Sequence, residues 1–178
     1  MDHGSSELTL KRLASAGLED THEQAVAMLI ALTDALPEGC VDIVCSDQRP
    51  RWYEIDIRPS NQLAARMTIY LCPHDAHHDD PAPVVVNAGH DIALDIIDMH
   101  YDDPTIDIPA IFAGIVRAII AGNVREVLYY RGDVLYRSRC RVEACDQPIE
   151  LDRTNVPKWL SSLGKRHSRK TVAYEPYY

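Results

Sequence analysis

The side chains best suited to chemistry lie in one short stretch, HDAHHDDPAP, at positions 74–83. Imidazole and carboxylate groups bind zinc and manganese, and a metal site needs three or four of them to converge. The candidate ligands are His74, His77, His78 and Asp79. Prolines on both sides of the stretch indicate a loop, which holds ligands less rigidly than a helix does. We therefore expect an exposed loop without a metal or other cofactor, and a metal-dependent hydrolase that uses residues 74–80 is the alternative.

A second histidine–aspartate pattern follows. His90-Asp91, with Asp95, Asp98 and His100 after it, is similar to the pattern of HD-type phosphohydrolases. That family places its ligands on long helices, whereas His90 follows a turn glycine within β-like sequence. The chain also lacks a glycine-rich phosphate loop, a Gly-x-Ser-x-Gly elbow and a Cys-x-x-Cys pair. We expect no catalytic residues, and hence a binding protein rather than an enzyme.

Negative charge is concentrated in the middle of the chain. The 178 residues have a formal net charge of −9, yet no lysine or arginine occurs from Met67 to Val116, a span that holds nine aspartates. An acidic surface attracts a basic protein and repels the phosphates of nucleic acid. We therefore expect a surface that docks a basic protein and no nucleic acid; an acidic surface that only maintains solubility is the alternative. The predicted contact residues are Asp79, Asp80, Asp91, Asp95, Asp98, Asp102 and Asp103.

Composition and the number of cysteines indicate the cellular compartment in which the protein is expected to work. A hydrophobic content of 46% and a charged content of 25% are ordinary for a soluble globular protein. No apolar run approaches the roughly 18 residues of a membrane span, and the first residues have no signal-peptide pattern. The odd number of cysteines and their wide spacing argue against a disulfide framework. The cysteines are Cys40, Cys45, Cys72, Cys140 and Cys145. We expect a cytoplasmic protein with reduced thiols and no membrane contact.

Periodicity predicts the elements that must position these residues. Apolar residues at helical spacing predict helices over 21–36, with a Thr21–Gln24 capping box, and over 107–121. Alternation or β-branched content predicts strands over 41–46, 52–58 and 67–72, and hairpins around Asn87-Ala88-Gly89 and Arg131-Gly132-Asp133; residues 91–100 also fit a helix. A short helix is expected near 156–164. The pattern predicts one α+β domain over 1–178, with a polar lead-in at 1–20 and an antiparallel sheet covered on one face by the two main helices.

Basic residues gather near the end of the chain. Arg137, Arg139 and Arg141 alternate on one strand face, where pairing with Glu54 and Asp56 or plain solvation is expected rather than phosphate contact. Residues 165–178 form a basic, tyrosine-rich stretch that we expect to be a solvated tail. Docking of its tyrosines (Tyr174, Tyr177, Tyr178) on another chain would instead indicate a scaffold or subunit protein.

The isoleucine-rich helix and the following GNVREVLYYRGDVLYRSRCRVE, about residues 105–145, resemble the helix-then-hairpin ending of immunity proteins from bacterial polymorphic-toxin and contact-dependent inhibition systems. The resemblance is one of shape and composition, and it transfers no functional residue. It implies a protein that binds a cognate toxin domain and blocks its active site. An acidic face opposed to a basic nuclease is frequent in that family, and the aspartate-rich span suits this role.

Overall fold

The computed structural model describes residues 9–18, 20–48, 52–72, 84–90, 92–95, 108–144, 148–154 and 167–178. These residues form three helices and nine strands. In chain order they are α1 (Leu10–Ala14), α2 (Asp20–Asp34), β1 (Val41–Asp47), β2 (Tyr53–Pro59), β3 (Met67–Leu71), β4 (Val84–Ala88), β5 (Ile92–Asp95), α3 (Ile108–Ile120), β6 (Val124–Arg131), β7 (Val134–Val142), β8 (Ile149–Thr154) and β9 (His167–Ala173). The predicted α+β fold with antiparallel strands is confirmed.

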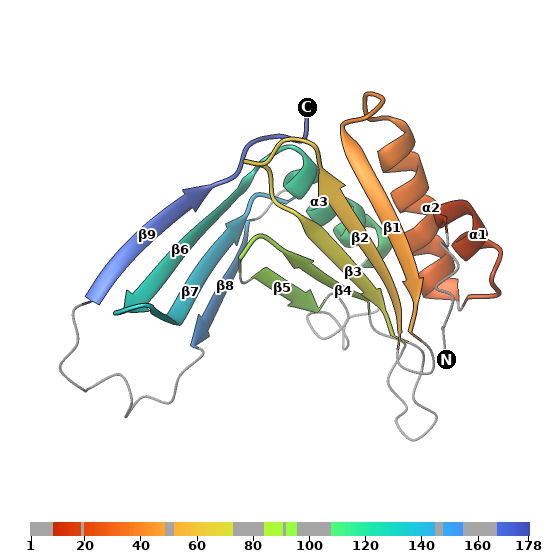
Figure 1. The fold of residues 1–178 in the computed structure, drawn as a ribbon. Helices are drawn as coiled ribbons and strands as arrows, with labels where there is room; N and C mark the ends of the chain where they lie inside the picture. Colours follow the sequence, from red (N-terminus) through yellow and green to blue (C-terminus); the bar gives the residue numbers. More distant parts are fainter. Residues whose placement is uncertain are drawn as a thin grey trace, which may run out of the picture.

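The strands form two sheets where the sequence led us to expect one. Five strands pair in the order β1-β2-β3-β4-β5, and four pair in the order β8-β7-β6-β9. All pairings within both sheets are antiparallel. Helix α3 separates β5 from β6 in the chain, so the strands that follow it start a second sheet. Figure 1 shows the two sheets diverging from the region where the C-terminal segment crosses between them.

The core lies on the helix-covered face of the five-stranded sheet. Alternate residues of β2, such as Ile55 and Ile57, are almost fully buried, as their spacing predicted. Leu29 of α2 and Ile115 of α3 are fully buried in the same hydrophobic cluster, and α2 and α3 pack against each other. The cluster also includes Val142 of the second sheet. One hydrophobic core therefore joins the helices to both sheets.

The start of the second helix and the first 20 residues differ from the predictions. Helix α2 begins at Asp20, so Thr21 lies inside its first turn and does not cap it. Asp20 and Glu23 place carboxylates in that turn, where the helix dipole favours negative charge. Within the expected polar lead-in, Thr9 caps the short helix α1 by accepting a hydrogen bond from the Arg12 backbone amide at 3.3 Å. Leu13 of α1 is buried, so this segment belongs to the packed fold.

The C-terminal stretch is part of a sheet rather than the solvated tail we expected. Strand β9 pairs with β6 along its length, although most of its side chains are exposed. Beyond it, the Tyr177 backbone amide bonds the Ile120 carbonyl at 2.9 Å, and the Tyr177 hydroxyl donates to the Ala65 carbonyl at 2.6 Å. Tyr177 is 1% exposed. Because Tyr177 is buried in its own chain, it is not available to dock on another protein.

Two further predictions concern cysteines and membranes. Cys40, Cys45 and Cys140 are free and buried, as expected for small apolar residues of a core. Burial raises the pKa of the Cys45 thiol to about 11 and that of Cys140 to about 12, so both stay neutral at physiological pH. Among the described residues, no helix combines the length and the apolar character needed to cross a membrane. The helix expected near 156–164, and Cys145, lie outside the described residues.

Candidate functional site

Most of the predicted site residues lie outside the described residues. These are His74, His77, His78, Asp79, Asp80, Asp91, Asp98, Asp102 and Asp103. Asp95 is the last residue of β5 and pairs with Val85 of β4. Across the described residues alone, no group of three or more histidine, cysteine, aspartate or glutamate side chains could hold a metal ion. The metal-free loop at 74–80 stays a prediction.

The strands that flank the two aspartate-rich segments end together. Leu71 ends β3 and pairs with Val84, the first residue of β4, while Val85 pairs with Asp95 at the end of β5. Segments 73–83 and 96–107 therefore join the chain at one end of the five-stranded sheet. Neighbouring strands are only about 5 Å apart, so the two attachment points lie close together. His90 and Ile92, on either side of Asp91, lie at the opposite end of the β4–β5 hairpin.

The outer face of the four-stranded sheet carries five of the described arginines. We define this arginine face as the side chains that the strand registers place on one side of β6, β7, β8 and β9. They are Arg125, Val127, Tyr129, Arg137, Arg139, Arg141, Glu150, Asp152, Thr154, Arg169, Thr171 and Ala173. The opposite face carries the buried Val124, Leu128 and Val142. Strands β6 and β7 thus have one face in the core and one in solvent, as their alternating sequence predicted.

The three arginines of β7 are paired with carboxylates, but not with those of β2. Arg137 donates from Nε to the Asp152 carboxylate at 2.7 Å, and Arg139 donates to the same carboxylate at 3.0 Å. Arg141 bonds Glu143 at 2.6 Å and Glu150 at 3.2 Å. Partners on β8 were not foreseen because the sequence does not reveal that β8 lies beside β7. The predicted pairing with Glu54 and Asp56 is therefore wrong, because the carboxylates that reach these arginines across strands come from β8.

The predicted partner Asp56 has arginines of its own sheet instead. It accepts hydrogen bonds from Arg58 Nε at 2.7 Å and from Arg66 Nε at 2.8 Å. Burial alone would raise the pKa of this carboxyl, but the hydrogen bonds from Arg66 and Arg58 outweigh it and hold the pKa below its ordinary value. Asp56 is 4% exposed, so this ion-paired cluster supports the fold and offers no open binding site.

The other half of the arginine face, on β6 and β9, carries cations that have no carboxylate partner among the described residues. Within the part of the chain that the structure describes, Arg125 and Arg169 have no ion pair. Arg125 stands directly opposite Arg141 in the register, and Arg169 stands opposite Tyr129. The Arg137 guanidinium lies 5.7 Å from the centroid of the Tyr129 ring. This half combines positive charge with a partly exposed tyrosine and valine, a composition typical of protein interfaces.

A hydrogen-bonded chain of three side chains joins the two sheets. Glu126 of β6 is fully buried, and its carboxylate accepts a hydrogen bond from the Tyr174 hydroxyl. The His90 backbone amide donates to the same carboxylate at 3.1 Å, and His90 Nδ1 lies 2.8 Å from the Tyr174 oxygen. Because the only hydroxyl proton of Tyr174 goes to Glu126, the Tyr174 oxygen accepts from His90, whose Nδ1 must carry a proton.

These contacts support the fold and do not form a catalytic site. Burial of the Tyr174 phenol, together with its hydrogen bond to Glu126, raises its pKa far above the ordinary value, so it stays protonated. A base oriented by a second group is a common catalytic arrangement, but no nucleophile accompanies His90 among the described contacts. The sequence did hold a signal for Glu126, because it lies between Val124 and Leu128 on a strand face that is otherwise apolar.

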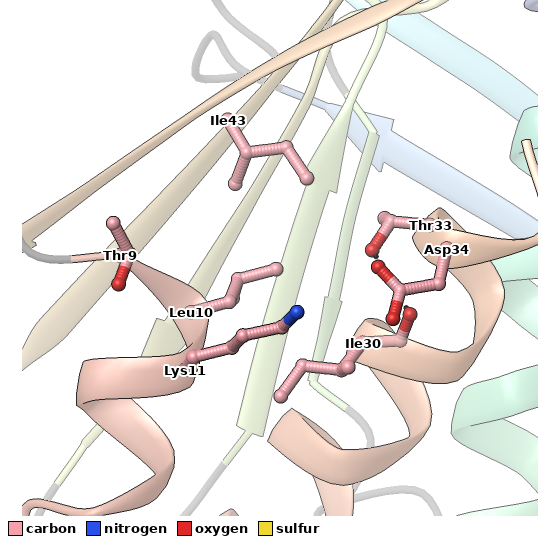
Figure 2. Close-up of a pocket in the computed structure, with 7 residues that line it drawn as sticks. All are labelled: Thr9, Leu10, Lys11, Ile30, Thr33, Asp34 and Ile43. Atoms are coloured by element: carbon pink, nitrogen blue, oxygen red, sulfur yellow. Dashed lines mark hydrogen bonds between the residues drawn. The ribbon is translucent and has the colours of Figure 1, made fainter. Parts of the chain in front are cut away.

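A shallow pocket of about 220 Å³ lies between α1, α2 and β1. Figure 2 shows Lys11 reaching from α1 toward Asp34 of α2, with Leu10, Ile30 and Ile43 around them. The Thr33 hydroxyl at its edge is already committed to the Leu29 carbonyl at 2.8 Å. Sites for small molecules usually measure about 300–1,000 Å³ and hold several convergent polar groups. This pocket is smaller and open, and it carries no functional assignment.

Comparison with known proteins gives no match: no protein-family model, curated protein or solved structure is similar to this chain.

Proposed function

We propose that this protein is a non-catalytic binding protein of the immunity or inhibitor kind, which neutralises a basic toxin domain through its aspartate-rich segments. The observation that carries the proposal is the common attachment of segments 73–83 and 96–107 at the Leu71–Val84–Asp95 end of the five-stranded sheet. These two segments contribute seven aspartates and no lysine or arginine. Seven like charges that start from neighbouring strand ends create a strong local field.

Such a field suits recognition of a basic protein. Complementary charge accelerates association and excludes partners of the wrong sign, whereas the affinity itself comes from buried contacts at the centre of an interface. An inhibitor needs fast capture of its target, and it needs no catalytic group of its own. A basic nuclease domain fits these requirements, since its active-site cleft must be positive to bind nucleic acid.

The test begins with capture of the partner by tagged protein from a lysate of the source cells, followed by association kinetics on the purified pair. Replacement of Asp79, Asp80, Asp102 and Asp103 by asparagine removes four charges from the two segments. The association rate should fall roughly tenfold or more in this variant, and it should also fall as salt rises.

The matched control removes the same charge from elsewhere. Asp34, Glu38, Asp42 and Asp133 are exposed and lie outside both segments, so their amide variants change the net charge equally. The control should slow association much less than the docking variant. An acidic partner, or equal effects of the two variants, would refute the proposal; so would capture of no protein.

A further inference from the structure

We propose that the β6–β9 half of the arginine face is a second binding surface. It fits a protein strand that carries an apolar side chain with one carboxylate on each side of it. This surface lies on the four-stranded sheet and is positive, whereas the aspartate-rich segments join the chain at the five-stranded sheet and are negative. The proposal therefore does not depend on the function proposed above, and its failure would leave that function untouched.

Charge is distributed unevenly across the arginine face. On the β7–β8 half, Asp152, Glu150 and the neighbouring Glu143 neutralise the arginines of β7. On the β6–β9 half, Arg125 and Arg169 remain exposed without a carboxylate among the described residues. Like charges placed directly opposite each other on neighbouring strands are destabilising, and Arg125 stands opposite Arg141. An anion bound at Arg125 would relieve this repulsion.

The positions of Arg125 and Arg169 define the spacing of the ligand. Arg169 is opposite Tyr129, which lies four residues along β6 from Arg125. At about 3.4 Å per residue, the two arginines stand roughly 14 Å apart along the strand direction. Val127 lies midway between them on the same face and is half-buried. A facing strand with carboxylates at positions i and i+4 and an apolar residue at i+2 repeats this spacing.

The neighbouring groups favour a protein over a nucleic acid. The carboxylates of the β7–β8 half would repel a continuous phosphate backbone that crossed the sheet. A protein strand can meet the positive half with its carboxylates and the carboxylate-bearing half with basic or neutral side chains. Tyr129 adds a partly exposed ring beside Arg137, and tyrosine and arginine are the residues most often found at the centres of protein interfaces.

A titration followed by amide NMR tests the surface with defined probes. The probe is a cyclised β-hairpin peptide that presents glutamate, valine and glutamate at alternate positions on one face; cyclisation limits the entropy lost on binding. Shifts should concentrate on the amides of β6 and β9. Replacement of Arg125 and Arg169 by glutamine should weaken binding roughly tenfold. Replacement of Arg12 and Arg117, two exposed arginines on helices, changes the net charge equally and should alter binding less than about twofold.

Two further probes test whether the surface requires the predicted spacing of carboxylates and whether it prefers a protein to a nucleic acid. A hairpin of the same composition, with its glutamates adjacent on the face and only about 7 Å apart, should bind more weakly, because it cannot reach both arginines. A single-stranded oligothymidylate tests the competing ligand class. The proposal is overturned by tighter binding of the oligonucleotide, by equal binding of the two hairpins, or by the absence of binding at millimolar peptide. Unchanged urea midpoints of both arginine variants will show that they fold.

Discussion

Tyr174 donates its hydroxyl proton to the carboxylate of Glu126, a side chain with no exposure to solvent. Tyr174 directly follows β9, while Glu126 lies in β6, and the His90 amide from the β4–β5 turn donates to the same carboxylate. One buried charge is thus held by groups from both sheets. Because an unsatisfied buried carboxylate is costly, the contact helps to fix how the two sheets meet.

Replacement of Tyr174 by phenylalanine should therefore destabilise the fold. The change keeps the ring and removes one donor from a buried carboxylate, which typically costs about 1–3 kcal/mol. Urea denaturation at neutral pH measures the loss. Tyr178 is 71% exposed, so its phenylalanine variant is a control that should leave the midpoint unchanged. Equal midpoints for the two variants would mean that the Tyr174 hydroxyl contributes nothing to stability.

Replacement of Gly89 by alanine should destabilise the protein more than the same change at Gly39. Both glycines have positive φ, 62° and 76°, which costs an L-residue roughly 1–2 kcal/mol. A Cβ atom at Gly39 would meet nothing within 4 Å, whereas one at Gly89 would lie 2.8 Å from the Tyr174 ring and 2.9 Å from the Glu126 carboxylate. The difference between the two variants isolates the steric cost. Similar unfolding free energies for the Gly89 and Gly39 variants would show that Tyr174 and Glu126 can move aside for the added Cβ atom at little cost.

Truncation of Ile115 to alanine should remove about 2–5 kcal/mol of stability. Ile115 is fully buried on α3, in the cluster that joins both sheets, and its loss would leave a cavity. Ile111 lies one turn earlier and is only partly buried, so its alanine variant should cost clearly less. Thermal or urea unfolding of the two variants measures the contrast. A larger loss of stability at Ile111 than at Ile115 would mean that the face of α3 that carries Ile115 is not the one that packs in the core.

The sequence alone predicted the helices and strands whose apolar spacing matches the side that they bury in the structure. The spacing of Phe112, Ile115 and Ile119 predicted α3, and those residues are buried. The alternation of β2 predicted its buried face, because one side of the strand meets the core and the other meets polar groups. The hairpin that turns at Gly132-Asp133 was visible for the same reason.

Contacts between residues far apart in the chain could not be predicted from the sequence. The basic run from Arg169 to Lys170 resembles a solvated tail because both faces of β9 are exposed there, and only its pairing with β6 makes it a strand. The position of Glu126 between Val124 and Leu128 signalled a buried carboxylate, but its partners, His90 and Tyr174, come from distant parts of the chain and could not be predicted. The carboxylates that neutralise the β7 arginines were missed for the same reason.

Asp152 provides a test of the arginine face by pH. Hydrogen bonds from Arg137, and then from Arg139, lower the pKa of this carboxyl to about 2 despite some desolvation. A folded-state pKa below the unfolded one means that the pair contributes stability above the unfolded value, near 3.9, and loses it as pH falls toward 2. Because the pair is exposed, its effect on stability is small, and the ionisation state of Asp152 itself is the informative quantity.

Carboxyl-carbon NMR follows that ionisation directly. At about pH 3 an unperturbed aspartate is mostly protonated, whereas Asp152 should remain mostly ionised. Replacement of Arg137 by glutamine removes the larger of the two donors and should move the Asp152 midpoint upward, toward the ordinary value. Replacement of Arg125, which lies on the same face without contacting Asp152, should leave the midpoint in place. A midpoint near 4 in the unaltered protein, or one indifferent to Arg137, would show that Arg137 and Arg139 are solvated rather than held by Asp152. The difference in charge between the two halves of the arginine face would then be lost.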